Sequence, residues 1–244
     1  MVGDNRETRS GNPPTVKPLA GPGLLSGFFI FMAFVSWRKW PDILVDFGHE
    51  LYIPWQLLSG KILYRDIAFL YGPFSQYFNS FLFACFGISL ATLVYANIIL
   101  LTGVLTVLYL AFGKLFDRLT SFACSAVFLL VFAFAQNVGI GNYNFVSPYS
   151  HEATHGIVLA AVLMCLLWRF VTRHHSYLLT AAGVILGLIF MTRAEVALAA
   201  SAYTVCFLTL SLIHSDRKGR TAVKWILLLT GARSFPPPRF SPFS

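Results

Sequence analysis

Residues 88–113 read ISLATLVYANIILLTGVLTVLYLAFG, a stretch of 26 residues without a single charged side chain. A helix needs about 20 mostly apolar residues to cross a hydrocarbon core of roughly 30 Å, so this stretch is long enough for one span. Similar stretches recur along the 244-residue chain, in which 57% of the residues are hydrophobic and only 11% are charged. Water-soluble cores do not repeat such runs. The sequence therefore predicts an all-α polytopic membrane protein.

The apolar runs divide the chain into a membrane domain and two terminal segments. We expect residues 1–18, which are polar and contain three prolines, to form a disordered cytoplasmic tail. Residues 19–230 form the transmembrane domain. Residues 231–244 are atypical because their proline run cannot continue a helix, which suggests a truncated or frame-shifted product. About six to seven spans fit the domain, at residues 19–37, 88–113, 119–136, 152–171, 177–191 and 195–213, with a seventh from Ala222.

The basic residues orient these spans, because cytoplasmic loops carry an excess of Lys and Arg. If the spans alternate, eleven basic residues before Gly231 fall on one side and five on the other. The eleven are Arg6, Arg9, Lys17, Lys114, Arg118, Arg169, Arg173, Arg217, Lys218, Arg220 and Lys224, and the five are Arg38, Lys39, Lys61, Arg65 and Arg193. We therefore expect a cytoplasmic N-terminus. The net charge of +8 comes from basic residues that lie in short clusters between apolar runs, where they act as topology signals. We therefore expect no nucleic-acid partner.

The first outer loop, residues 38–87, contains an apolar piece that is too short for a span. Phe74 to Phe86 has 13 residues, and a span there would reverse the sidedness of every basic loop downstream. We predict instead an interfacial helix that starts after Pro73 and ends at Gly87.

Four of the chain's ten acidic residues lie in this loop, namely Asp42, Asp46, Glu50 and Asp66. If residues 46–59 are helical, Asp46 and Glu50 share one face. The apolar stripe beside them would consist of Phe47, Leu51, Trp55 and Leu58. This pattern predicts an amphipathic interfacial helix with aromatic rings at headgroup depth and carboxylates above them. A carboxylate at such a boundary can act as a general base, because partial desolvation raises its pKa.

Two arginines on the outer side are candidate phosphate contacts. Arg65 has the planar fork that suits phosphate, although the adjacent Asp66 offers it a simple ion pair. Arg193 and Glu195 lie at the outer ends of two spans, either as a second phosphate contact or as a pair that snorkels to the interface. Both alternatives are open for each arginine.

The second outer loop, NYNFVSPYSHEATHG at residues 142–156, combines aromatic and polar side chains. Rings beside amides and hydroxyls, as around Tyr149, are typical of sugar sites. His151, Glu152 and His155 also form the pattern HExxH, which on a helix places two imidazoles on one face for zinc. An intramembrane metalloprotease is therefore an alternative, with His151 and His155 as metal ligands and Glu195 or a first-loop acid as the third. Without zinc, these residues line an outer vestibule.

Four segments of the first outer loop resemble, in order, the first outer loop of bacterial GT-C glycosyltransferases, which are similar to dolichyl-phosphate-mannose protein mannosyltransferases. The segments are DFGHELYIPW at residues 46–55, GKILYRDI at 60–67, YGPFSQY at 71–77 and LFACFG at 82–87. The resemblance extends over about residues 20–215. It includes the order of parts, which is one span, a large loop with interfacial helices, and then many spans.

The resemblance implies a GT-C-like fold in a bacterial inner membrane and an inverting sugar transfer on the non-cytoplasmic side. The donor would be a polyprenyl-phosphate sugar, and the acceptor hydroxyl would belong to a lipid, a glycan or a protein. Asp46 best matches the family's catalytic acid. Many members carry an adjacent Asp-Glu pair, whereas three residues separate Asp46 from Glu50 here, so either of the two is a candidate base.

The other site candidates are expected to bind substrate. They are Arg65, Asp66, Tyr149, His151, Glu152, His155, Arg193 and Glu195. No cofactor is expected, and a divalent metal is an open alternative. A further alternative is a transporter or flippase of lipid-linked sugars, which would carry polar residues near the middle of the membrane on broken helices.

Overall fold

The computed structural model describes residues 20–39, 47–135, 144–173, 175–213 and 225. Within these ranges the chain forms eight α-helices and one π-helical segment, and no β-strand. The elements are α1 (Ala20–Val35), α2 (Gly48–Leu58), α3 (Phe74–Phe86), α4 (Leu90–Leu115), α5 (Arg118–Val127), η2 (Phe128–Ala133), α6 (His151–Arg173), α7 (Ser176–Phe190) and α8 (Ala194–Ile213). The predicted all-α class is confirmed.

Three helices, α4, α6 and α8, are long and apolar enough to cross a membrane. Their surfaces present bare apolar side chains, such as Ile99 at 72% and Leu198 at 74% exposure, which water would solvate poorly. Shorter apolar helices cover residues 21–35, 118–133 and 176–190. The chain is thus an integral, multi-pass membrane protein. The predicted terminal tails and the seventh span lie outside the described residues, apart from Trp225.

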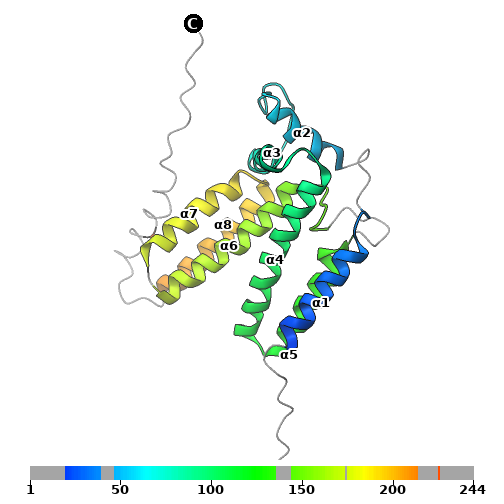
Figure 1. Ribbon diagram of the computed structural model, residues 1–244. Helices are drawn as coiled ribbons and strands as arrows, with labels where there is room; N and C mark the ends of the chain where they lie inside the picture. The colour runs from blue at the N-terminus through cyan, green and yellow to red at the C-terminus, as the bar shows by residue number, and fades with distance from the viewer. Residues whose placement is uncertain (1–19, 40–46, 136–143, 174, 214–224, 226–244) are drawn as a thin grey trace, which may run out of the picture.

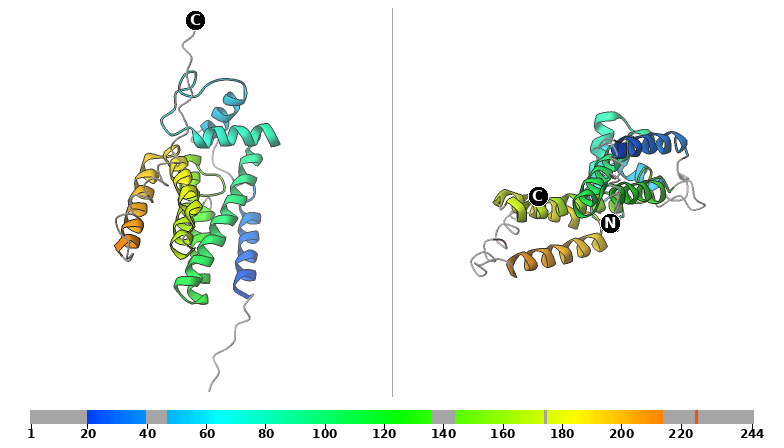
Figure 2. Two further views of the ribbon diagram at one scale, coloured as in Figure 1. Left: turned by 90° about the vertical axis from the view of Figure 1, so that its left-hand side faces the viewer. Right: turned by 90° about the horizontal axis from the view of Figure 1, so that it is seen from below.

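The helices form two groups (Figures 1 and 2). In one group α1 and α4 pack with α5 and η2, and in the other α6 packs with α7 and α8. Leu101 and Leu129 are fully buried in the first group, and Leu163 and Leu179 are fully buried in the second. Contacts between α4 and α6 join the two groups.

The third predicted span contains a change of helix type. The α-helical hydrogen bonding of α5 gives way to the π-helical segment η2 after Val127. Residues 119–136 contain no charged residue, proline or glycine, so the sequence pattern alone gives no sign of this change.

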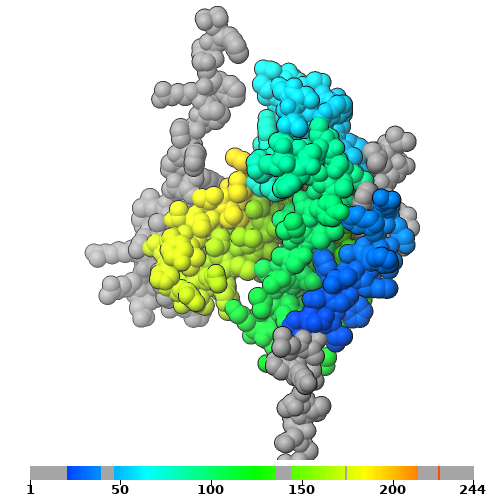
Figure 3. All heavy atoms as spheres, viewed as in Figure 1, coloured from blue at the N-terminus to red at the C-terminus, as the bar shows by residue number. Residues whose placement is uncertain are grey.

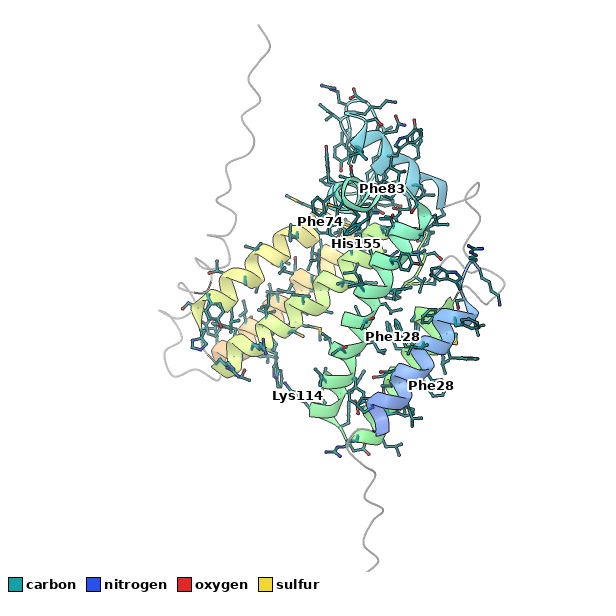
Figure 4. The ribbon with its side chains drawn as sticks, in the orientation of Figure 1. Phe28, Phe74, Phe83, Lys114, Phe128 and His155 are labelled. Atoms are coloured by element: carbon teal, nitrogen blue, oxygen red, sulfur yellow. The ribbon has the colours of Figure 1, made fainter. Side chains whose placement is uncertain are left out.

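Helix α3 lies across the ends of the long helices instead of along them (Figure 2, left). It begins after Pro73 and ends at Gly87, whose φ of 89° is a conformation that glycine adopts without strain. Both the helix and its bounds agree with the sequence prediction. Side chains of α2 and α3 cover one end of the bundle (Figure 3), and Lys114 marks the opposite end (Figure 4).

Helix α2 buries an acidic side chain that we predicted to lie above the membrane interface. Its buried residues are Glu50, Ile53, Pro54, Gln56 and Leu57, whereas Trp55 and Leu58 of the predicted apolar stripe are exposed. The prediction that the carboxylates lie above the interface is therefore wrong for Glu50, which is fully buried. Packing against α3 and polar partners on α3 and α6 allow Glu50 to be buried. Asp42 and Asp46 lie outside the described residues.

The chain just before α3 is fastened to the turn between α7 and α8. The N–H of Gly72 donates to the carbonyl of Thr192 at 2.8 Å, and the N–H of Phe74 donates to that of Met191 at 2.9 Å. A Cβ at Gly72 would overlap the backbone carbonyl of Met191. Only glycine allows this approach, which fixes the first outer loop to the second helix group.

Replacing Gly72 with alanine is expected to lower the free energy of unfolding by about 1–3 kcal/mol, because two backbone segments must separate to admit the methyl group. Gly103 in α4 is the matched control, since a Cβ there meets nothing within 4 Å. Gly103→Ala is expected to raise stability by about 0.5–1 kcal/mol through helix propensity. Unfolding in detergent measures both, and equal effects would show that the close approach does not matter.

Candidate functional site

A buried polar cluster lies where α2, α3, α4 and α6 meet, near His155 and Phe74 in Figure 4. Every member is at most 3% exposed. The members are Glu50, Gln76, Asn97, Ser150, His151, Glu152 and His155. Burying so many polar groups is unfavourable unless they are paired, so their hydrogen bonds decide what the cluster does.

Glu50 uses both carboxylate oxygens. Its Oε2 accepts hydrogen bonds from His151 Nδ1 at 2.9 Å and Gln76 Nε2 at 3.2 Å. Its Oε1 accepts from the backbone N–H of His151 at 3.0 Å and lies 3.2 Å from His49 Nε2. Burial alone would raise the pKa of Glu50, but His151 and then His49 outweigh it and hold that pKa well below its ordinary value.

The contacts of Glu50 fit an anchor better than a general base. An ionised carboxylate with four donors around it has a weak tendency to take up another proton. The backbone N–H of His151 belongs to the first residue of α6, where helical N–H groups lack partners within their own helix. Glu50 thus supplies a long-range cap that ties the first outer loop to the start of α6.

The two nitrogens of the His151 ring have different partners. Nδ1 contacts Glu50, and Nε2 lies 3.0 Å from the amide nitrogen of Asn97. The same Asn97 nitrogen donates to the carbonyl of Val146 at 3.1 Å. Because Asn97 presents its donor here, Nε2 of His151 is the acceptor and Nδ1–H donates to the Glu50 carboxylate. His151 therefore links α2, α4 and α6.

Gln76 of α3 bridges the two buried glutamates. Its Nε2 lies 2.7 Å from Glu152 Oε1 and 3.2 Å from Glu50 Oε2, so its two amide hydrogens serve different carboxylates. Ser150 Oγ donates to the other oxygen of Glu152 at 3.0 Å. Sequence reasoning did not single out Gln76 or Asn97. An amide inside an otherwise apolar run is the signal that would have found both.

His155 packs against aromatic rings, and its Nδ1 has no hydrogen-bond partner among the described residues. The edges of Phe74 and Phe78 meet its ring at centroid distances of 6.1 and 5.2 Å. Four buried polar atoms in this area have no hydrogen-bond partner in the part of the chain that the structure describes, namely Ser75 Oγ, Gln76 Oε1, Asn79 Nδ2 and His155 Nδ1. Leaving such an atom unpaired costs about 1–3 kcal/mol, and four in one place is unusual.

The HExxH residues do occupy the first turns of α6, with the His151 and His155 ring centroids 5.6 Å apart. Among the described residues, however, no group of three or more His, Cys, Asp or Glu side chains is placed to hold a metal ion. Of the proposed third ligands, Glu195 is 73% exposed and pairs with Arg193, and the first-loop acid Glu50 already accepts hydrogen bonds from His151 and Gln76. Zinc at His151 would also have to displace Glu50 or Asn97. This donor set fits a hydrogen-bonded network better than a zinc site.

Arg193 lies between an aromatic ring and a weak ion pair. Its Cζ is 4.5 Å from the centroid of the Tyr71 ring, and its Nη2 donates to the Tyr71 hydroxyl at 3.3 Å. Its Nε is 3.6 Å from Glu195 Oε2. Burial tends to lower the pKa of Arg193, but a hydrogen bond with Tyr149 and the neighbouring Tyr71 and Glu195 raise it on balance. The only carboxylate paired with this mostly buried cation among the described residues is the exposed Glu195, and the Nε of Arg193 makes no hydrogen bond there, so Arg193 keeps donors that suit an anion.

Arg65 forms the simple ion pair that was one of its two alternatives. Its Nε and Nη2 donate to the two oxygens of Asp66, each at 2.9 Å. Asp66 also accepts from the N–H of Ile62 at 2.8 Å, so it closes the loop between residues 62 and 66. The hydrogen bonds from Arg65, together with that from Ile62, lower the pKa of Asp66 to about 2. Both side chains are turned toward solvent.

The structure thus brings Glu50, His151, Glu152 and His155 together, joins Arg193 to Tyr149 and Glu195, and leaves the Arg65–Asp66 pair at the surface. Comparison of the chain with protein-family models, with curated proteins and with solved structures found no match. The chemistry of these residues is therefore the evidence from which function must be argued.

Proposed function

We propose that this protein is a membrane glycosyltransferase that moves a sugar from a polyprenyl-phosphate donor to an acceptor hydroxyl on the non-cytoplasmic side, with inversion. The observation that carries the proposal is Arg193, a mostly buried cation at the end of the bundle that α2 and α3 cover. An arginine held on an aromatic ring there suits the phosphate of a donor whose lipid tail lies in the bilayer.

In the proposed reaction the acceptor oxygen bonds to the anomeric carbon while the bond from that carbon to the phosphate oxygen breaks. The bonding electrons leave with the lipid phosphate, whose charge Arg193 stabilises. The acceptor's proton passes to a carboxylate of the first outer loop, for which Asp46 is the candidate. Such a base contributes about 10²- to 10⁴-fold to the rate. Glu50 and His151 hold the loop on α6 in this scheme.

The distribution of polar side chains favours transfer over transport. The buried network joins the start of α6 to α2 and α3, which lie across one end of the bundle (Figure 2). A transporter typically carries such residues on helices broken near the middle of the membrane. The long helices α4, α6 and α8 run unbroken through the described residues.

Transfer of radiolabelled sugar by the full chain in lipid nanodiscs tests the proposal. We expect label to pass from polyprenyl-phosphate sugars to cell-envelope lipids, glycans or proteins, and not from nucleotide sugars. An assay with the protein in vesicles distinguishes sugar transfer from transport of the lipid-linked sugar. Movement of an intact lipid-linked sugar between leaflets, without cleavage of its phosphate bond, would contradict the proposal.

Arg193→Ala is expected to raise the KM for the lipid donor by about 10- to 100-fold, because one charge-assisted contact to the phosphate is lost. Arg65→Ala is the comparison, since Arg65 already pairs with Asp66 at the surface. A change of about fivefold or less is expected there. Steady-state transfer kinetics distinguish the two, and a larger effect at Arg65 would move the phosphate site to the first loop.

A further inference from the structure

Four unpaired polar side chains lie on α3 and α6, two helices that contact each other, and we call this group the α3–α6 polar face. It consists of Ser75, Gln76 and Asn79 of α3 and His155 of α6. All four side chains are at most 3% exposed. The hydrogen bonds described above involve only one atom of this face, the amide nitrogen of Gln76, which donates to Glu50 and Glu152.

Helical geometry places these residues side by side. On α3, Phe74 and Phe78 share a face that meets His155, while Gln76 meets Glu152. His155 and Glu152 are three residues apart on α6, so they are neighbours on its surface. At about 100° per residue, Ser75 and Asn79 occupy the sector of α3 between the two contacts. Ser75 and Asn79 therefore lie on α3 between the side chains that contact Glu152 and those that contact His155.

The chemistry of the free atoms selects a class of ligand. Gln76 Oε1 can only accept a hydrogen bond and Asn79 Nδ2 can only donate one, while Ser75 Oγ and His155 Nδ1 can do either. An anion would be opposed by the Gln76 oxygen and by Glu152, and a metal cation would be opposed by the Asn79 amide hydrogens. Hydroxyl groups match because each donates and accepts. The Phe74 and Phe78 rings, stacked at 5.9 Å, add the flat apolar surface that sugar rings pack against.

We propose that the α3–α6 polar face binds the hydroxyl groups of the substrate's sugar ring. This proposal rests on the glycosyltransferase activity proposed above. Because the face is closed in this structure, the sugar enters when α3 separates from α6. The ring then takes the hydrogen bonds that Ser75, Gln76, Asn79 and His155 lack.

A matched pair of substitutions separates sugar binding from a structural role. Asn79 and Asn97 are 1% and 2% exposed, but only Asn97 has partners for its amide nitrogen, at Val146 and His151. The full chain in nanodiscs would be unfolded thermally with and without methyl glycosides of glucose, galactose, mannose and N-acetylglucosamine. Asn79→Leu and Asn97→Leu would be treated in the same way.

We expect at least one glycoside to raise the Tm of the wild type more than that of Asn79→Leu. Sugars also stabilise proteins in general because they are excluded from protein surfaces, and comparing the two proteins removes this common effect. Without glycoside, Asn97→Leu should lower the Tm, whereas Asn79→Leu should leave it unchanged or raise it, because an unpaired polar atom is removed. Ser75→Ala, the smallest change on the face, should also reduce the glycoside shift.

Two results would overturn the proposal. Equal glycoside shifts in wild type and Asn79→Leu would show that sugars do not bind there. A loss of Tm in Asn79→Leu as large as in Asn97→Leu would show that ordered water satisfies the face. The transfer assay distinguishes a failure of the sugar-binding proposal from a failure of the glycosyltransferase proposal. Transfer without a specific glycoside shift removes only the sugar site, and a specific shift without transfer removes only the enzymatic activity.

Discussion

Replacing Glu50 with alanine is expected to lower the free energy of unfolding by about 3–5 kcal/mol, because several buried donors lose their acceptor at about 1–3 kcal/mol each. The change leaves His151 Nδ1–H, the first N–H of α6 and one hydrogen of the Gln76 amide without their acceptor. These groups remain buried, so their desolvation is no longer compensated. Denaturant or thermal unfolding in detergent measures the loss.

Glu195→Ala is the matched control for that substitution. Glu195 is also a glutamate with a side-chain partner, but it is 73% exposed and lies 3.6 Å from Arg193. Exposed pairs contribute about 0–1 kcal/mol, so its loss should change stability by no more than that amount. Similar losses in both variants would show that the Glu50 network does not hold the first outer loop on α6.

Acid should remove the stabilisation that Glu50 provides. The folded-state pKa of Glu50 lies below its ordinary value of 4.5, so the carboxylate stabilises the fold fully above that pH. The contribution is then lost as the pH falls from about 4.5 toward the lower folded-state pKa. Wild-type stability should therefore decline in this window, whereas Glu50→Gln should be less stable at neutral pH and should decline less. A decline of the same size in both would assign the acid sensitivity to other groups.

Local signals were sufficient for the outline of the fold. The bounds of α3 follow from Pro73 and Gly87, because proline starts a helix readily and glycine ends one in a left-handed conformation. The apolar runs likewise locate α4, α6 and α8, since the length that a bilayer demands is visible in the sequence. Both kinds of signal lie within the segment that they describe.

The orientation of α2 shows what local signals cannot supply. The sequence pattern predicts that Glu50 lies above the membrane interface, but the structure buries it completely within the protein. The partners that make Glu50 stable inside are Gln76 and His151, which are 26 and 101 residues away. A carboxylate is buried only where donors surround it, and the sequence alone does not show that these segments meet.

Asp46→Asn is expected to lower kcat for sugar transfer by about 10²- to 10⁴-fold, because an amide cannot take the proton of the acceptor hydroxyl. Asp42→Asn, in the same loop, is the control and should retain most of the activity. Phe47, the residue that follows Asp46 in the sequence, is fully buried against Phe83 and Leu93. Initial rates with the labelled lipid donor, with Tm measured for each variant, separate lost chemistry from lost folding. Retained transfer in Asp46→Asn would exclude it as the base, and Glu152, which has fewer donors than Glu50, would become the next carboxylate to test.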